Sequence, residues 1–172
     1  MKKLTETFKE NKRVLIFCGR VVFLLVLFNY LNNYFESSGV HQWLIDVLGK
    51  SSTYILSIFG FSFYYDQSSI QLNGEEILLI GSTCDGLSFM ALFLAFVVSY
   101  PARNLSKKGV FICIGILTIH LLNTIRTILL ILNFQYHGTS FDFNHKYTFV
   151  VIVYGIVLWM WMVWAKRNVS KV

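Results

Sequence analysis

The chain has 172 residues, of which 55% are hydrophobic and only 14% are charged, whereas about a quarter of the residues are charged in ordinary soluble domains. A soluble domain of this size could not bury so much apolar surface, because small proteins have a large surface for their volume. The composition therefore excludes an ordinary soluble protein and favours a membrane protein with a single domain over residues 1–172.

The net charge of +6 reflects membrane topology and does not indicate nucleic acid as a partner. Basic residues lie beside the apolar runs in three places, at 2–13, 103–108 and 166–171, whereas most acidic residues lie in the other connections. Positively charged flanks mark the cytoplasmic side of a membrane. We therefore expect both termini and the 103–108 loop on that side.

The first apolar run, residues 14–35, is expected to be a retained membrane span. It follows a basic segment, as the apolar part of a signal peptide does, but it continues to Phe35 and offers no convincing small-residue cleavage site. Its length suits a hydrocarbon core of about 30 Å, which about 17 to 25 helical residues can cross.

The segment 40–63 is expected to form an interfacial or re-entrant helix pair. Asp46 and Lys50 interrupt its apolar character. The segment connects two spans on the outer side, so it must cross the membrane an even number of times, and it is too short to cross twice.

The next segment, residues 68–84, predicts a short extracytoplasmic β-hairpin. Asn73-Gly74 lies between two short apolar stretches, and this dipeptide is the strongest signal for a two-residue hairpin turn. The second strand would lead the chain directly to Cys84.

Three further apolar runs are expected to be spans, at 86–102, 109–134 and 147–165. Each is long enough to cross a bilayer as a helix. The predicted fold class is therefore an all-α multi-pass membrane protein. It has about four transmembrane helices, the interfacial segment and the short hairpin.

Among the three cysteines, Cys84 has an unusual position. Cys18 and Cys113 lie near the cytoplasmic ends of their spans, whereas Cys84 precedes Asp85 and Gly86 at the outer start of a span. A disulfide to either other cysteine would have to cross the membrane, which the Cα separation of about 4–7 Å in disulfides forbids. Cys84 is therefore a candidate nucleophile.

Arg126 is the second unusual residue, because an arginine within a transmembrane run usually faces a cavity and acts there. A helix that begins near Gly109 rises about 25 Å before it reaches Arg126, which places the side chain at the level of Cys84. Asn123 and Asn133 share its face of the helix. An arginine that snorkels outward or pairs with a carboxylate is the alternative.

His145 lies two residues before the last span, again on the outer side. Cys84, Arg126 and His145 thus come from different segments but share one level. A histidine can take the proton of a thiol, and a guanidinium group can stabilise an oxyanion, so the set suits acyl transfer through a thioester. His137 is a possible substitute for His145. No Cys/His spacing indicates a metal site, and we expect no cofactor.

The stretches STCDGLSFMALF, NTIRTILLILN and FDFNHKYTFVVIVYG resemble, in order and spacing, three conserved blocks of the exosortase/archaeosortase family. The likeness covers roughly residues 65–160, and the short length resembles that of the compact Bacteroidota-type forms. These proteins are integral membrane cysteine transpeptidases. The resemblance implies that Cys84 is the nucleophile, Arg126 the transition-state stabiliser and His145 the acid/base, with Asn123 and Gly86 in support.

The resemblance also implies the substrate and the compartment. Such an enzyme would cleave the C-terminal tail of secreted proteins, which consists of a motif, a transmembrane helix and a basic end. It would pass the trimmed protein to a lipid or glycan acceptor at the outer face of the bacterial cytoplasmic (inner) membrane.

Asp85 departs from the family pattern, which commonly has serine at this position. A carboxylate beside the thiol opposes thiolate formation, but Asp85 could instead orient His145 or pair with Arg126. Two other functions stay open. One is hydrolysis of the thioester by water, and the other is a non-enzymatic transporter or scaffold that uses Arg126 to bind an anionic lipid or solute.

Overall fold

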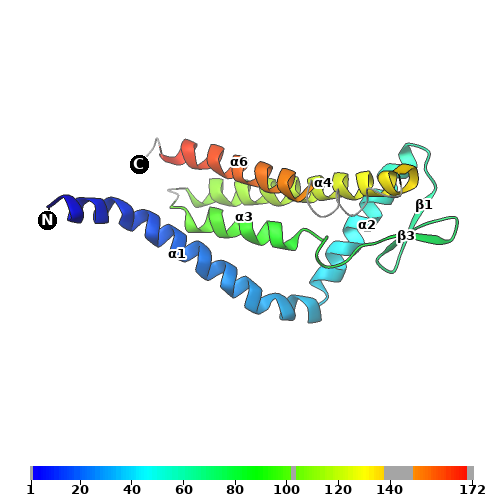
Figure 1. The fold of residues 1–172 in the computed structure, drawn as a ribbon, viewed down its shortest axis with the longest axis horizontal. Coiled ribbons are helices and arrows are strands. Elements are labelled where there is room, and N and C mark those ends of the chain that lie inside the picture. The colour runs from blue at the N-terminus through cyan, green and yellow to red at the C-terminus, as the bar shows by residue number, and fades with distance from the viewer. Residues whose placement is uncertain (1, 102–103, 138–148, 170–172) are drawn as a thin grey trace.

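The computed structural model describes the backbone of residues 2–101, 104–137 and 149–169. Its helices and strands are α1 (Lys2–Ser37), α2 (Val40–Ile58), β1 (Phe63–Asp66), β2 (Ser69–Leu72), β3 (Glu75–Leu79), α3 (Leu87–Ser99), α4 (Leu105–His137) and α6 (Phe149–Val169). In Figure 1, α3, α4 and α6 lie side by side and α1 runs obliquely beside them. α2 and the strands lie at the end of the molecule away from both termini.

Two helices among the described residues are long and apolar enough to cross a membrane, Val14–Ser37 within α1 and Leu105–Gln135 within α4. The α1 segment is peripheral, with 6% of it buried, whereas 44% of the α4 segment is buried. α3 is a shorter apolar helix of 13 residues. The predicted helical character is therefore confirmed and two of about four expected spans are supported, while spans at α3 and α6 stay predictions.

Aromatic side chains fill the centre of the bundle formed by α3, α4 and α6. Phe93 of α3 is almost completely buried, and the rings of Phe111 in α4 and Trp164 in α6 stack with their centroids 5.2 Å apart. Gly115 lets α4 approach α3, because a Cβ at this position would lie 2.1 Å from the Phe93 ring. Close aromatic packing thus holds the three helices together.

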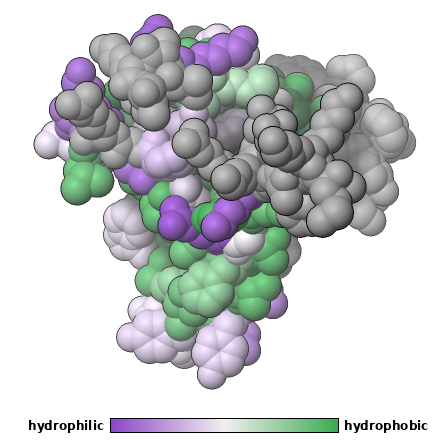
Figure 2. Space-filling model, turned by 90° about the vertical axis from the view of Figure 1, so that its left-hand side faces the viewer, coloured by the Kyte–Doolittle hydropathy of each residue, from purple (hydrophilic) through white to green (hydrophobic). Residues whose placement is uncertain are grey.

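The end of the bundle that carries both termini also carries the connection between α3 and α4 (Figure 1). Figure 2 looks onto this end and shows hydrophilic residues beside broad hydrophobic areas. Basic residues at the described ends of α4 and α6 are Lys107, Lys108, Lys166 and Arg167. The molecule therefore has one end with basic residues, opposite the end formed by α2 and the strands.

The three strands form an antiparallel sheet in the order β1-β2-β3. The predicted hairpin is present as β2 and β3, and Asn73 and Gly74 have φ values of 54° and 86°, as a type I′ turn requires. The strand β1 was not predicted. It joins β2 through Gln67 and Ser68, which also have positive φ, and this dipeptide is a weak turn signal in a sequence.

The expected helix pair in residues 40–63 is wrong, since α2 is one continuous helix of 19 residues. Lys50 is exposed, and Asp46 accepts hydrogen bonds from Gln42 at 2.8 Å and from the hydroxyl of Tyr65 at 2.7 Å. Water therefore solvates Lys50, and polar side chains bind the carboxylate of Asp46. A helix with one polar face can contain such residues without a break.

The sheet is fixed onto α2 through Tyr65. Its ring lies over Gly49, where a Cβ would be 2.2 Å from the ring. The hydrogen bond from Tyr65 lowers the pKa of Asp46, and burial together with Asp46 raises the pKa of Tyr65 to about 12. In addition, α2, the sheet and α4 share an apolar core that includes Ile45, Leu48, Leu56, Phe63, Ile70, Leu78, Ile80, Leu130 and Ile131.

Candidate active site

Cys84 lies in the short connection between β3 and α3. The connection leaves the sheet where the amide of Ile80 donates to the carbonyl of Ser68 at 2.8 Å, and it turns where the amide of Cys84 donates to the carbonyl of Gly81 at 2.9 Å. Gly86 then adopts a φ of 85°, in the left-handed region that favours glycine. The backbone can therefore turn sharply into α3.

Asn123 of α4 holds the backbone of this turn. It is 2% exposed, and its Nδ2 donates a hydrogen bond to the carbonyl oxygen of Cys84 at 2.6 Å. The same amide nitrogen would lie 3.2 Å from a Cβ at position 86. The turn can approach α4 this closely because residue 86 is a glycine.

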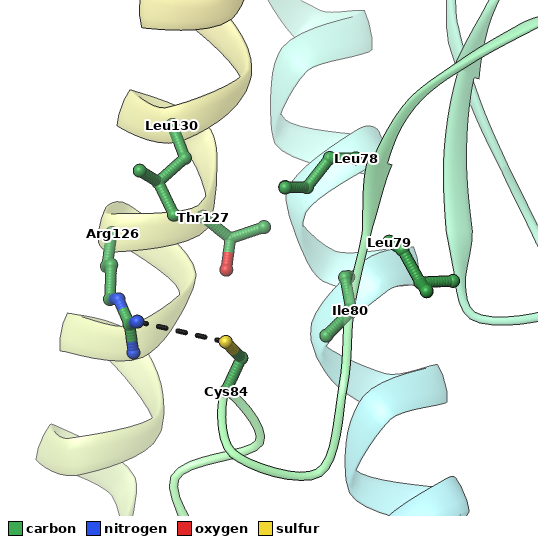
Figure 3. A pocket seen from close by; sticks show the side chains of 7 residues that line it. All are labelled: Leu78, Leu79, Ile80, Cys84, Arg126, Thr127 and Leu130. Carbon is green, nitrogen blue, oxygen red and sulfur yellow. Dashed lines mark hydrogen bonds between the residues drawn. The ribbon is translucent and has the colours of Figure 1, made fainter. Parts of the chain in front are cut away.

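Arg126 lies three residues after Asn123, on the same face of α4. It is 6% exposed, and its Nη2 donates to Sγ of Cys84 at 3.8 Å, as Figure 3 shows. The guanidinium group is thus buried at the thiol and does not snorkel outward. One face of α4 therefore contacts both the backbone and the side chain of Cys84.

A small pocket opens beside the thiol and encloses about 230 Å³ of empty space, the open mouth included. Figure 3 shows the seven residues that line it, which are Leu78, Leu79, Ile80, Cys84, Arg126, Thr127 and Leu130. The walls are mainly aliphatic, and the sulfur and the guanidinium group supply a nucleophile and a cation. The recess therefore places a thiol and a cation beside a mainly aliphatic surface.

Asp85, directly after Cys84, is 2% exposed and uses both carboxylate oxygens. Oδ1 accepts a hydrogen bond from the amide of Leu87 at 2.8 Å, at the start of α3. Oδ2 contacts Nδ1 of His41 in α2. From the sequence, His145 and Arg126 were considered as partners of Asp85. The contact observed is with His41 instead.

His41 is the site residue that the sequence did not single out. It is 8% exposed, and its Nε2 faces Oδ1 of Asn32 in α1 at 3.3 Å. Because 44 positions separate His41 from Asp85, no local pattern connects them. The sequence offered only an indirect signal. Asp85 stands next to an apolar run, and a buried carboxylate requires a polar or charged partner.

Two other histidines considered from the sequence cannot be placed in the site. His145 lies outside the described residues, and for His137 only the backbone, at the end of α4, is described. Cys18 and Cys113 are exposed on α1 and α4. Among the described residues, no group of three His, Cys, Asp or Glu side chains is arranged to hold a metal ion.

The fold and the site define a mostly helical protein with membrane-length helices and a cysteine held against a buried arginine. The model of the transmembrane exosortase family (Exosortase_EpsH) matches residues 11–165, which is most of the chain. The chain therefore belongs to this family, whose general role is that of a membrane transpeptidase. Searches of curated proteins and of solved structures gave no match.

Proposed function

We propose that this protein cleaves the C-terminal sorting signal of secreted proteins with Cys84 as the nucleophile. The trimmed protein is then transferred from a thioester to a lipid or glycan acceptor. The observation that carries the proposal is the contact of 3.8 Å between Nη2 of Arg126 and Sγ of Cys84, beside a mainly aliphatic pocket. Membership of the transmembrane exosortase family supports the class of reaction.

In the first step, the thiolate of Cys84 attacks the carbonyl carbon of the scissile peptide bond. A C–S bond forms, and the carbonyl oxygen becomes an oxyanion. The guanidinium group of Arg126 favours the thiolate through a charge-assisted hydrogen bond and stabilises the oxyanion. Both effects are strong at this site because Arg126 is largely buried from water.

In the second step, the C–N bond breaks and the leaving amine takes a proton. His145 is the proposed donor, a role that follows from the family resemblance. A hydroxyl or amine of the acceptor then attacks the thioester and loses its proton to the same histidine, while the C–S bond breaks and Cys84 leaves as the thiolate with which the cycle began.

The positions of the charged residues support an outer location for the cleavage. The basic residues of α4 and α6 lie at the end of the bundle opposite the sheet, and Cys84 directly follows the sheet (Figure 1). If the basic end faces the cytoplasm of the bacterial cell, Cys84 lies at the extracytoplasmic face of the membrane. A substrate helix with a basic end in the cytoplasm would then present its outer motif at the level of Cys84.

The test is to co-express the protein with a secreted protein that ends in a motif, an apolar helix and a basic tail. The parent protein should remove the tail, whereas Cys84→Ala should insert into the membrane but leave the tail intact. Cys113→Ala is the matched control, because this cysteine is exposed on α4 and should not affect cleavage. Mass spectrometry of the trapped intermediate should locate the adduct on Cys84.

The outcome that contradicts the proposal is full cleavage by Cys84→Ala. If only the Arg126 variants then lost activity, a binding role for Arg126 would replace acyl transfer.

A further inference from the structure

A carboxylate lies buried directly beside the proposed nucleophile. Asp85 follows Cys84 in the chain and is 2% exposed. A negative charge in this position opposes formation of the thiolate, because two like charges repel strongly where water is largely excluded. The site therefore needs a group that compensates the charge of Asp85.

Arg126 contacts the sulfur, and His41 contacts the carboxylate. Nδ1 of His41 is bonded to Oδ2 of Asp85, while the other carboxylate oxygen is occupied by the amide of Leu87. Arg126 of α4 thus contacts the thiol, and His41 of α2 contacts its acidic neighbour.

Both ring nitrogens of His41 face oxygen atoms. Nδ1 faces a carboxylate oxygen, and Nε2 faces the amide oxygen Oδ1 of Asn32 at 3.3 Å. Both partners are acceptors, and only the imidazolium ion donates a hydrogen bond from both ring nitrogens. The imidazolium ion therefore satisfies both contacts.

We propose that His41 is a positioning residue that compensates the charge of Asp85, so that Asp85 can accept the hydrogen bond from the amide of Leu87 without suppressing the reactivity of Cys84. The side-chain contacts from Asn32 to His41 and from His41 to Asp85 connect α1 and α2 to the turn that carries the nucleophile. This inference rests on the proposed role of Cys84 as the nucleophile.

The experiment measures how fast Cys84 is alkylated by iodoacetamide in the full-length protein, in detergent or lipid discs, from pH 5 to 10. Cys18 and Cys113 are first replaced by alanine, since both are exposed and would react. His41→Ala should slow alkylation at pH 7 about ten-fold and move the rate profile to higher pH.

The decisive variant is the double substitution His41→Ala with Asp85→Asn. Asparagine keeps an oxygen for the amide of Leu87 but carries no charge, so alkylation should return to within about two-fold of the parent rate. Equal rates for His41→Ala and the parent would overturn the inference. A double variant that reacts as slowly as His41→Ala would also overturn it. In that case the loss would come from the missing contact and not from the charge of Asp85, because removing the charge would not restore the rate.

Asp85→Asn alone covers the case in which His41→Ala does not fold. Loss of the carboxylate should leave alkylation at least as fast as in the parent, whereas a purely structural role predicts slower and less uniform reaction. These measurements need no substrate. Failure of the inference is therefore distinct from failure of the proposed function, which is decided by tail cleavage in Cys84→Ala.

Discussion

The side-chain amide of Asn123 donates a hydrogen bond of 2.6 Å to the carbonyl oxygen of Cys84, 39 positions earlier in the chain. The backbone of the proposed nucleophile is thus fixed to the middle of α4. Arg126, one turn further along the same helix, contacts the sulfur. One rigid helix therefore sets both the position of the turn and the direction of the thiol.

Loss of the Asn123 amide should destabilise this turn. Asn123→Ala leaves the carbonyl of Cys84 without this donor in a largely buried place, which costs about 1–3 kcal/mol. We expect a lower thermal midpoint and slower tail cleavage, measured on the same preparation. Asn133→Ala is the control, since its Nδ2 has no hydrogen-bond partner among the described residues. Equal effects of the two substitutions would contradict this role.

Replacement of Arg126 should mainly reduce the rate of the chemical step. Arg126→Gln keeps a hydrogen-bond donor but removes the charge, and loss of an oxyanion-stabilising group lowers rates about 100- to 1,000-fold. Arg126→Lys keeps the charge without the planar, delocalised guanidinium group and should recover only part of the rate. Single-turnover cleavage is the measurement, and a rate for Arg126→Gln near that of the parent would show that the charge is not required.

Gly86→Ala should disturb the entry into α3. The residue has a φ of 85°, which alone costs a non-glycine residue about 1–2 kcal/mol, and the new Cβ would lie 3.2 Å from the Asn123 amide. Thermal unfolding and cleavage should both show the loss. Gly81→Ala, in the same turn, meets its nearest atom at 3.9 Å and should behave like the parent. The opposite ranking of the two variants would refute the explanation.

The contact between Tyr65 and Asp46 should make stability depend on pH at both extremes. Folding lowers the pKa of Asp46 from 3.8, so its contribution is present above that value and is lost as the pH falls through the lower folded-state pKa. Folding raises the pKa of Tyr65 from 10.0 to about 12, so its contribution is complete below pH 10 and is lost as the pH rises towards 12.

The measurement for this contact is the difference in thermal midpoint between the parent and Tyr65→Phe. The difference should be largest between about pH 5 and 9 and should shrink towards both extremes. If the two proteins had the same midpoint at every pH, the contact would act only through packing of the ring on Gly49, because phenylalanine keeps the ring.

Much of the helical architecture was predictable, because long apolar runs and charged flanks are local properties of the chain. The helices expected at 14–35 and 109–134 correspond to the candidate spans in α1 and α4. The turn at Asn73-Gly74 was predictable as well, since its backbone conformation depends on those two residues. The strand β1 was missed because Gln67 and Ser68 form its turn without a glycine.

The amino-acid sequence by itself determined the membrane class, the apolar runs and the common level of Cys84 and Arg126, because helix rise and hydropathy follow from residues that are close in the chain. Only the tertiary structure decided that Asp85 pairs with His41. That contact depends on how α2 crosses towards the start of α3, and the crossing is set by the packing of Tyr65 on Gly49 and by the shared core with α4. A contact between residues 44 positions apart has no local signal in the sequence. The partner of the buried carboxylate is therefore visible only in the tertiary structure.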